Sequence, residues 1–523
     1  MSEGCNDNMK STPLMSSETN KKIAKNTLML YTRQILILLV SLYTVRVVLN
    51  VLGVEDYGIY NVVGGIVSFF SFLSGTMASA TQRFFSYALG EHNLEKLKKT
   101  FIVNLVIYGV IAIIALVILE TIGVWFVNEQ LRVPLERFEA ARWIYHFSVL
   151  TFIATIFITP FMAIIIAHED MQIYAYVSIV EVVMKLGVVF LLMYLPWDKL
   201  ELYGVLVFVV SVINAIIYIG ICTRRYRECQ FRKFYWDKEL FREIIGFTGW
   251  TLFGQITTVV RNQAVTILLN QVFTPVVVAA RAIATNITSR INVFSNNFNV
   301  GLYPPIIKSY AANDKKNLFS LIYNGSKMTF FLMWVFALPM FLEMDIILHL
   351  WLKNPPPEAV LFTRLALVEV LINSMSLPIT TAARAPGRMK IYELTLGSIQ
   401  IAIFIVSWVV LNMGAAAYSV FVVAIIANAI MFIVRLLIVR KLIDLSLKPY
   451  FYQVVFPVLG VTLFSGIPSF ALHIMLPDNL IFKIISGLIS VILVFISMYF
   501  IGLDKRWREK VRSIIVNRIR KIF

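Results

Sequence analysis

The chain has 523 residues, of which 59% are hydrophobic and only 15% are charged, and its mean hydropathy is +0.78. These values lie well outside the range of soluble globular domains and exclude a soluble protein. The formal net charge is +17. The positions of the basic residues along the chain indicate whether they bind nucleic acid or lie at a membrane surface.

Apolar runs of about 20 residues recur along the whole chain, and each is long enough to cross roughly 30 Å of hydrocarbon as a helix. Strands of a membrane barrel are shorter and alternate polar with apolar residues, which these runs do not. The sequence therefore predicts an all-α polytopic membrane protein. About fourteen transmembrane helices are predicted, at 28–51, 58–80, 101–126, 143–167, 172–195, 202–223, 248–272, 276–304, 320–342, 359–382, 391–413, 416–439, 451–475 and 480–502.

The basic residues fall on one side of this topology. With the N-terminus inside, about 33 lysines and arginines lie in cytoplasmic segments, and about five, mostly Arg132, Arg137 and Arg142, lie outside. By the positive-inside rule, both termini are predicted to be cytoplasmic. The asymmetry explains most of the net charge as topology and contact with anionic lipid, so no nucleic-acid partner is expected.

Neither a signal peptide nor a cysteine framework is expected. The first 27 residues are polar, and the first apolar run is long enough to remain in the membrane. Cys5, Cys222 and Cys229 have neither disulfide-scaffold nor metal-ligand spacing, and the last two flank a basic segment, so we expect them to be reduced on the cytoplasmic side.

Short sequences recur at an offset close to 218 residues. Polar loops match in the same order, which chance similarity between apolar sequences does not explain, so we predict an internal duplication. The matched pairs are Met-x-Ile-Tyr at 171–174 and 389–392, the preceding Pro160 and Pro378, "SYALGEHNLEKL" (86–97) with "SYAANDKKNLFSL" (309–321), and "VLNVLG" (48–53) with "LLNQVF" (268–273).

The duplicated unit contains six predicted spans. Because six is even, both copies enter the membrane in the same direction, and an axis along the membrane normal should relate them. The last two helices fall outside the duplication. The predicted parts are a cytoplasmic tail (1–27), an N-lobe (28–223), a basic cytoplasmic linker (224–247), a C-lobe (248–442), helices 13 and 14 (443–503) and a basic cytoplasmic tail (504–523).

Several arginines lie within predicted spans, where an ionisable group costs about 2.5–3.5 kcal/mol and is a functional candidate. Arg33 lies near the cytoplasmic end of the first span and Arg46 near its outer end, so either side chain could instead extend to an interface. Arg261 lies in the middle of span 248–272, beside Asn262 and Gln263. It is too deep to reach an interface easily, and we predict that it lines a water-filled cavity.

A polar stripe follows one face of span 276–304. Its members recur every three or four residues and cannot face lipid, so they line a cavity or pack on polar helices. They are Arg281, Thr285, Thr288, Asn292, Asn296 and Asn299. The duplicated counterpart, span 58–80, has a milder stripe whose small residues equally permit close helix packing. Its members are Asn61, Ser68, Gly75, Ser79 and Gln82.

Acidic residues at membrane depth are few. Glu181 and Lys185 are four residues apart and can pair on one helix face, as a structural pair or as part of an ion-coupling path. Glu369, in span 359–382, is another candidate for coupling to a proton or Na⁺ gradient. Spans 1, 2, 7 and 8 hold arginine, asparagine and threonine but no acid in their apolar cores, which favours an anionic substrate bound by guanidinium groups.

No catalytic pattern accompanies these residues. The sequence lacks a GxxxxGK[ST] phosphate loop, a cluster of metal-ligand residues, and a Ser–His–Asp or Cys–His set at catalytic spacing. We therefore predict a transporter that is not an enzyme and needs neither cofactor nor metal.

The segment "VRVVLNVLGVEDYGIYNVV" (45–63) carries a resemblance to a known family. It is similar to the Arg…Leu-Gly-x-x-x-Tyr-Gly-x-Tyr signature of the multidrug/oligosaccharidyl-lipid/polysaccharide (MOP) transporter superfamily, in its polysaccharide branch of Wzx-type flippases. The exit of the second span, "TQRFFSYALGEHN", its echo "IIKSYAANDKKN" and the twelve-plus-two layout also resemble this branch.

The resemblance implies a V-shaped pair of lobes that alternate access around a cavity lined by helices 1, 2, 7 and 8. It implies an undecaprenyl-diphosphate-linked oligosaccharide as substrate, carried across the bacterial inner membrane for surface polysaccharide such as lipopolysaccharide O-antigen. It also implies a glycan polymerase and glycosyltransferases as partners. The cavity candidates are Arg33, Arg46, Asn61, Arg261, Arg281, Arg290, Asn292 and Asn296, of which Arg290 is the weakest because it falls opposite Arg281 on the helix.

Three alternatives stay open. A drug or cation antiporter of the same superfamily shares the architecture but depends on acids embedded in its lobes, which spans 1, 2, 7 and 8 lack. A lipid II flippase resembles this chain more closely still. A membrane scaffold without transport activity would not explain Arg261 or the polar stripe.

Overall fold

The computed structural model describes residues 17–129, 134–230, 234–477, 479–504, 508–509 and 512. Throughout these ranges every regular element is a helix, and no strand occurs in them. The prediction of an all-α membrane protein is confirmed.

The helices account for all the predicted spans. Within the described residues, eleven helices are long and apolar enough to cross a membrane, and a bent pair, Glu55–Val67 with Ser71–Gly90, makes a twelfth. The remaining two spans are α8 (Lys238–Val272) and α9 (Pro275–Ala311), with 35 and 37 residues. At about 1.5 Å per residue, both exceed the hydrocarbon thickness. Their polar side chains lower their hydropathy, and these are the side chains that the sequence marks as functional.

The chain packs as two compact units, and each is described by itself. The first unit comprises residues 17–255 and 307–314, and the second comprises 256–306 and the residues from 315 onward. The boundary residue 306 follows Pro304 and Pro305 inside α9, so the last turns of this helix pack with the first unit.

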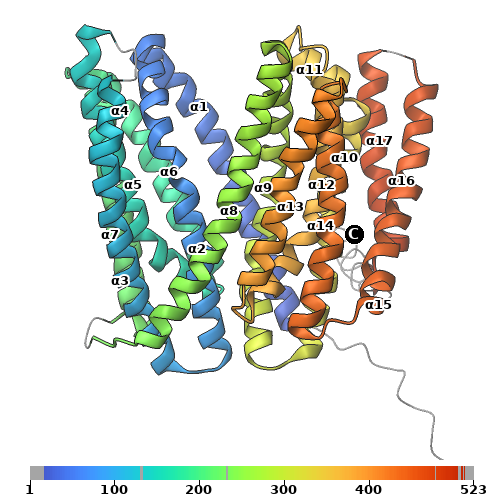
Figure 1. Ribbon diagram of the computed structural model, residues 1–523, viewed down its shortest axis with the longest axis horizontal. Helices are drawn as coiled ribbons and strands as arrows, with labels where there is room; N and C mark the ends of the chain where they lie inside the picture. The colour runs from blue at the N-terminus through green and yellow to red at the C-terminus, as the bar shows by residue number, and fades with distance from the viewer. Residues whose placement is uncertain are drawn as a thin grey trace, which may run out of the picture. The chain divides into compact units, whose positions relative to one another are not determined.

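In the first unit, α5 is the central helix and packs against α1, α2, α3 and α7 (Figure 1). Its inner face joins a core that contains Phe85, Phe101, Phe161, Ile164 and Tyr218. The elements of this unit are α1 (Ser17–Phe69), α2 (Ser71–Gly90), α3 (Leu94–Ile118), the π segment η1 (Leu119–Gly123), α4 (Val124–Glu129), the 3₁₀ turn η2 (Leu135–Arg137), α5 (Phe138–Ala167), α6 (Met171–Tyr194), α7 (Lys199–Arg225), the 3₁₀ turn η3 (Arg227–Cys229), and the start of α8.

α1 is interrupted at Gly53, whose φ of 78° and ψ of 170° are not helical. Glycine adopts this positive φ without a Cβ clash, so the leucine-glycine pair of the family-like signature marks a bend between two membrane segments. The first two predicted spans, 28–51 and 58–80, lie on either side of it.

In the second unit, α12 packs against both α10 and α14. Buried Phe362 of α12 contacts Phe421 of α14, with ring centroids 4.8 Å apart. Beyond the parts of α8 and α9 that belong here, the elements are α10 (Lys315–Leu342), α11 (Met344–Leu352), α12 (Ala359–Arg384), α13 (Lys390–Asn412), α14 (Ser419–Ile443), α15 (Leu447–Tyr450), the π segment η4 (Phe451–Val455), α16 (Phe456–Met475), α17 (Leu480–Ser497) and the π segment η5 (Met498–Gly502).

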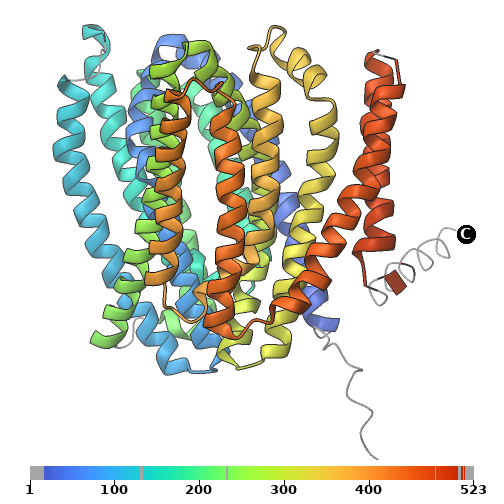
Figure 2. The same ribbon diagram turned by 45° about the vertical axis from the view of Figure 1, so that its right-hand side comes forward.

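The last two helices, α16 and α17, run side by side in both views and pack on α10 (Figures 1 and 2). Trp334 of α10 donates from Nε1 to Ser465 Oγ of α16 at 2.9 Å. At the two ends, His473 contacts Glu343 at 2.8 Å, and Lys327 pairs with Asp504 at 3.3 Å. Ser465 and His473 of α16 therefore bind α10 and Glu343, the residue that follows it, and Asp504, which lies after η5, binds α10 through Lys327.

The backbone repeats where the sequence repeats. His92 after α2 and Asn313 after α9 both have positive φ, 53° and 55°, at the matched "SYA" segments. Glu169 and Gly387, which precede the two Met-x-Ile-Tyr copies, also have positive φ, 64° and 81°. Glu169 and Gly387 each lie two residues before the methionine of their copy, and this shared left-handed turn supports the duplication.

Candidate functional site

Arg261 lies on the face of α8 that points into the second unit. Val265 and Leu268, four and seven residues later, are buried, so the three side chains share one side of the helix. The Arg261 side chain is only 11% exposed. A guanidinium at this depth needs a counter-charge from a neighbouring helix.

That counter-charge is Glu369 of α12, whose Oε1 lies 3.6 Å from Arg261 Nη1. This distance is longer than a hydrogen bond, so the pair is a loose ion contact. The same Oε1 accepts a hydrogen bond of 3.0 Å from Nδ2 of Asn428 on α14. Nε of Arg261 is buried and has no hydrogen-bond partner among the described residues.

Arg281 of α9 adds a second guanidinium beside this pair. Its Nε donates to Thr266 Oγ1 of α8 at 3.3 Å, and its guanidinium carbon lies 5.5 Å from the centre of the Phe421 ring. Arg281 experiences the charges of both Arg261 and Glu369 but forms no ion pair with any carboxylate of the described chain.

The cluster of Arg261, Arg281, Glu369 and Asn428, here called the arginine cluster, therefore holds two positive charges and one negative charge. The negative charge is Glu369, and its carboxylate lies closer to the side-chain amide of Asn428 than to the guanidinium of either arginine. A buried guanidinium with unfilled donor positions binds a phosphate or carboxylate strongly, because its planar fork matches two oxygens. The cluster is suited to an anionic group.

The structure brings three predicted residues together in this cluster, and neither its fourth member nor the Thr266 neighbour of Arg281 was predicted. Asn428 and Thr266 were missed, although Asn428 is a lone amide in the apolar run "AIIANAIMF". Asn214 stands in a similar run, "SVINAIIYI", of α7. Buried amides in apolar spans need hydrogen-bond partners, and this rule would have marked Asn428 and Asn214 as candidates.

In the first unit, Glu181 is fully paired. Lys185 Nζ lies 2.7 Å from its Oε1, and Asn214 Nδ2 donates to its Oε2 at 2.9 Å. The pairing of Glu181 with Lys185 follows the four-residue spacing. A carboxylate with a partner on each oxygen is suited to a structural pair, and a part for Glu181 in ion coupling stays a prediction.

Arg33 is buried inside the first unit, 8% exposed. Its Nη1 donates to Ser178 Oγ at 3.3 Å, and its guanidinium carbon lies 4.5 Å from the centre of the Tyr174 ring, both on α6. These contacts give Arg33 a packing role between α1 and α6, and its assignment to a substrate cavity stays a prediction.

The other candidates do not join the arginine cluster through any described contact. Arg46 and Asn61 are exposed, and Asn61 Nδ2 donates to the Tyr57 carbonyl of its own helix at 2.7 Å. On α9, Arg290 and Asn296 are exposed and Asn292 is half-buried.

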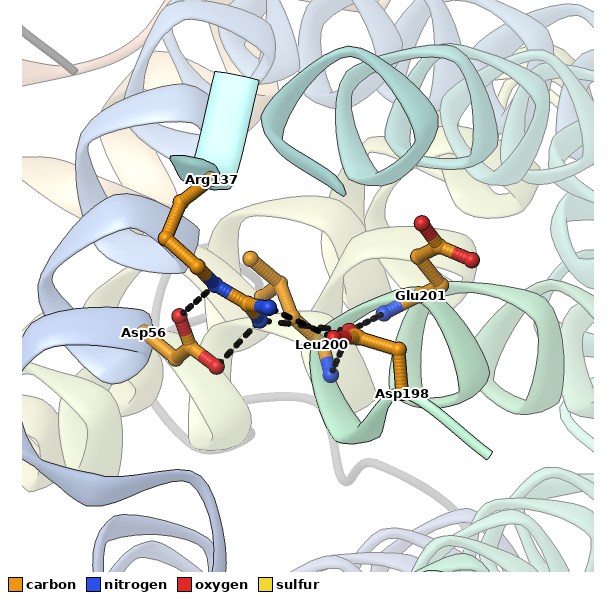
Figure 3. Close-up of polar contacts among 5 residues, drawn as sticks. All are labelled: Asp56, Arg137, Asp198, Leu200 and Glu201. Carbon is orange, nitrogen blue, oxygen red and sulfur yellow. Dashed lines mark hydrogen bonds and ion pairs between the residues drawn. The ribbon is translucent and has the colours of Figure 1, made fainter. Parts of the chain in front are cut away.

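The family-like signature contributes Asp56 to a group of ion pairs in the first unit (Figure 3). Arg137 donates from Nε and Nη2 to the two carboxylate oxygens of Asp56, at 2.8 and 2.5 Å. Its Nη1 also reaches Asp198 Oδ2 at 2.6 Å. Asp198 Oδ1 in turn accepts from the backbone N–H groups of Leu200 and Glu201 at the start of α7. Hydrogen bonding from Arg137, followed by these N–H groups, lowers the pKa of Asp198.

Two family models match the chain. The model described as polysaccharide biosynthesis protein matches residues 23–310, more than half of the chain, and the MatE model matches residues 251–409. The comparison with curated proteins gave no match.

Solved structures share the fold at low sequence identity. A crystal structure of a MATE point mutant has a TM-score of 0.73 at 13% identity and covers 84% of this chain and 99% of that one. An outward-facing multidrug resistance MATE family transporter of the MOP superfamily has a TM-score of 0.70 at 13% identity, covering 82% and 96%. A MOP superfamily transporter from Pyrococcus furiosus, described as having a binding pocket of reverse polarity that suggests a different function, has a TM-score of 0.66 at 14% identity, covering 84% and 99%.

Proposed function

Since this chain belongs to the polysaccharide biosynthesis protein family, and with it to the MOP superfamily of membrane transporters, we propose that it is a flippase for a lipid-linked oligosaccharide. Its substrate would be an undecaprenyl-diphosphate-linked oligosaccharide, moved across the bacterial inner membrane for surface polysaccharide biosynthesis. Both termini would face the cytoplasm.

The observation that carries this proposal is the unbalanced charge of the arginine cluster. Two guanidiniums lie near one carboxylate, that of Glu369, which contacts Arg261 at 3.6 Å and forms no ion pair with Arg281. A diphosphate offers several oxygens to such a site and would fill the donor positions of Arg261 and Arg281. The glycan headgroup would follow the diphosphate while the polyprenyl chain stays in lipid.

A cation exporter would need the opposite charge balance. A cationic substrate beside Arg261 and Arg281 would meet like charge at low dielectric, which costs several kcal/mol. The arginine cluster therefore favours an anionic substrate over a drug or metal cation. The description of the Pyrococcus transporter concerns that protein alone, but it supports the idea that pocket polarity varies on this fold.

The test is glycan display in a strain that lacks the chromosomal copy. Arg261→Ala and Arg281→Ala should each abolish surface glycan while the protein stays inserted at normal level, and lysine at either position should restore display only in part, because lysine lacks the bidentate fork. Arg142→Ala, which removes an exposed arginine of an outer segment, is the matched control and should display glycan normally. Normal glycan in both alanine variants of the arginine cluster would overturn the proposal.

A further inference from the structure

Glu369 is the one acidic member of the arginine cluster, and its hydrogen bonding is uneven. Asn428 Nδ2 approaches Glu369 Oε1 to 3.0 Å, whereas Arg261 Nη1 stays at 3.6 Å from the same oxygen. Asn428 is itself fixed, because its Nδ2 also donates to the Ala424 carbonyl at 2.8 Å and the residue is only 4% exposed. The carboxylate is thus anchored to α14 and only loosely paired to α8.

The arginines are held by weak contacts that an incoming anion can replace. Arg261 leaves its buried Nε without a hydrogen-bond partner among the described residues, and Arg281 has a 3.3 Å contact to Thr266 and an aromatic ring as neighbours. A phosphate oxygen binds a guanidinium at about 2.7–2.9 Å, closer than Glu369 does. Binding would therefore exchange the loose carboxylate contact of Arg261 for a closer phosphate contact.

We propose that Glu369 is a built-in counter-anion that the diphosphate displaces from Arg261, and that it thereby limits the affinity of the site for its substrate. Asn428 holds the displaced carboxylate in place. Before binding, Glu369 neutralises part of the buried positive charge; after binding, it repels the phosphate and favours release. This inference rests on the proposed function, since it assigns a positioning role within the same site.

Two substitutions should change the affinity in opposite directions. Glu369→Gln removes the repelling charge but keeps the shape of the side chain, and it should bind anions more tightly. Asn428→Ala frees the carboxylate to move onto Arg261, and it should bind anions more weakly. A merely structural role for Glu369 and Asn428 would predict the same direction for both, because each substitution disturbs the same hydrogen bond.

The experiment measures binding of geranylgeranyl diphosphate to the purified full-length protein in detergent by isothermal titration calorimetry. Relative to wild type, Kd should fall roughly tenfold or more for Glu369→Gln, as expected for removal of one like charge at close range. It should rise for Asn428→Ala and for Arg281→Gln. Glu343→Gln removes another buried carboxylate of the second unit, one that pairs with His473, and should leave Kd unchanged.

The outcomes separate this inference from the proposed function. If wild type binds and Arg281→Gln does not, but Glu369→Gln binds no more tightly than wild type, the counter-anion role is wrong and the anion site stands. If neither wild type nor Glu369→Gln binds the diphosphate, the anion site itself is wrong and both proposals fall. Size-exclusion profiles identical to wild type establish that the variants are folded.

Discussion

Arg261 and Arg33 are the same residue type within apolar spans, yet their surroundings differ. Arg33 contacts the hydroxyl of Ser178 and lies over the ring of Tyr174. Arg261 faces a carboxylate at 3.6 Å and has a second guanidinium nearby. The two arginines differ in the side chains that neighbouring helices place around them, and spacing along one helix does not predict those side chains.

The side chain of Arg137 joins three segments of the first unit. Its guanidinium pairs with Asp56 beyond the α1 bend and with Asp198 at the start of α7. Replacing it by alanine leaves two partly buried carboxylates without their cation. We expect Arg137→Ala to destabilise the protein by roughly 1–3 kcal/mol, measured as a lower thermal midpoint in scanning fluorimetry.

The effect of this substitution should depend on pH. The pKa of Asp198 is lowered in the folded state by Arg137 and by backbone N–H groups. Such a group contributes stability above the unfolded pKa of about 3.9, and this contribution is lost as pH falls through the folded pKa. The difference in thermal midpoint between wild type and Arg137→Ala should be largest at about pH 6–7 and should become smaller below about pH 4. A difference that widens as pH falls would show that Asp198 is not stabilised as its carboxylate.

At the scale of elements, the end of α9 is tied closely to the first unit. Lys308 Nζ lies 2.6 Å from Glu169 Oε1 in the turn before α6. Gly90 at the end of α2 has no room for a side chain, because a Cβ there would lie 2.7 Å from Ala311 Cβ and 2.7 Å from the Lys308 carbonyl oxygen. Neither neighbour can turn aside, because one is a backbone oxygen and the position of an alanine Cβ is fixed by its backbone.

Gly90 and Gly75 therefore make a matched pair on the same helix. A Cβ at Gly75 would meet nothing within 4 Å. We expect Gly90→Ala to destabilise the protein by about 1–3 kcal/mol through overpacking, whereas Gly75→Ala should be neutral or slightly stabilising, since alanine favours helix. Thermal midpoints of the two variants check this, and equal midpoints would contradict the close approach of α9 to α2.

At the scale of the whole molecule, hydropathy and repeats predict most of the architecture. Apolar runs locate the helices because a run of about 20 apolar residues has the length that a helix needs to cross the hydrocarbon core. The polar spans α8 and α9 also emerge from the sequence, by length and by the recurrence of polar residues on one face. The bend at Gly53 was not predicted, because a positive φ is a property of the folded backbone.

The site was predictable only in part. Arg261, Arg281 and Glu369 stand out as charges within apolar spans, but the sequence assigns no partner to any of them. Their meeting depends on how α8, α9, α12 and α14 pack, and this packing also recruits Asn428. Exposed Arg46 and Arg290 match the same sequence rule without joining the cluster, since depth in a span does not determine which way a side chain points.

We propose that the two arginines of this cluster move a diphosphate-linked glycan, and translocation in liposomes measures this movement directly. Vesicles that contain the purified protein and a fluorescent polyprenyl-diphosphate oligosaccharide would report transfer between leaflets by quenching from outside. Wild type should accelerate transfer over protein-free vesicles, and Arg281→Ala should reduce the rate at least about tenfold, the loss expected when a charged bidentate contact is removed. Equal rates for wild type and Arg281→Ala, both above the protein-free vesicles, would contradict the claim.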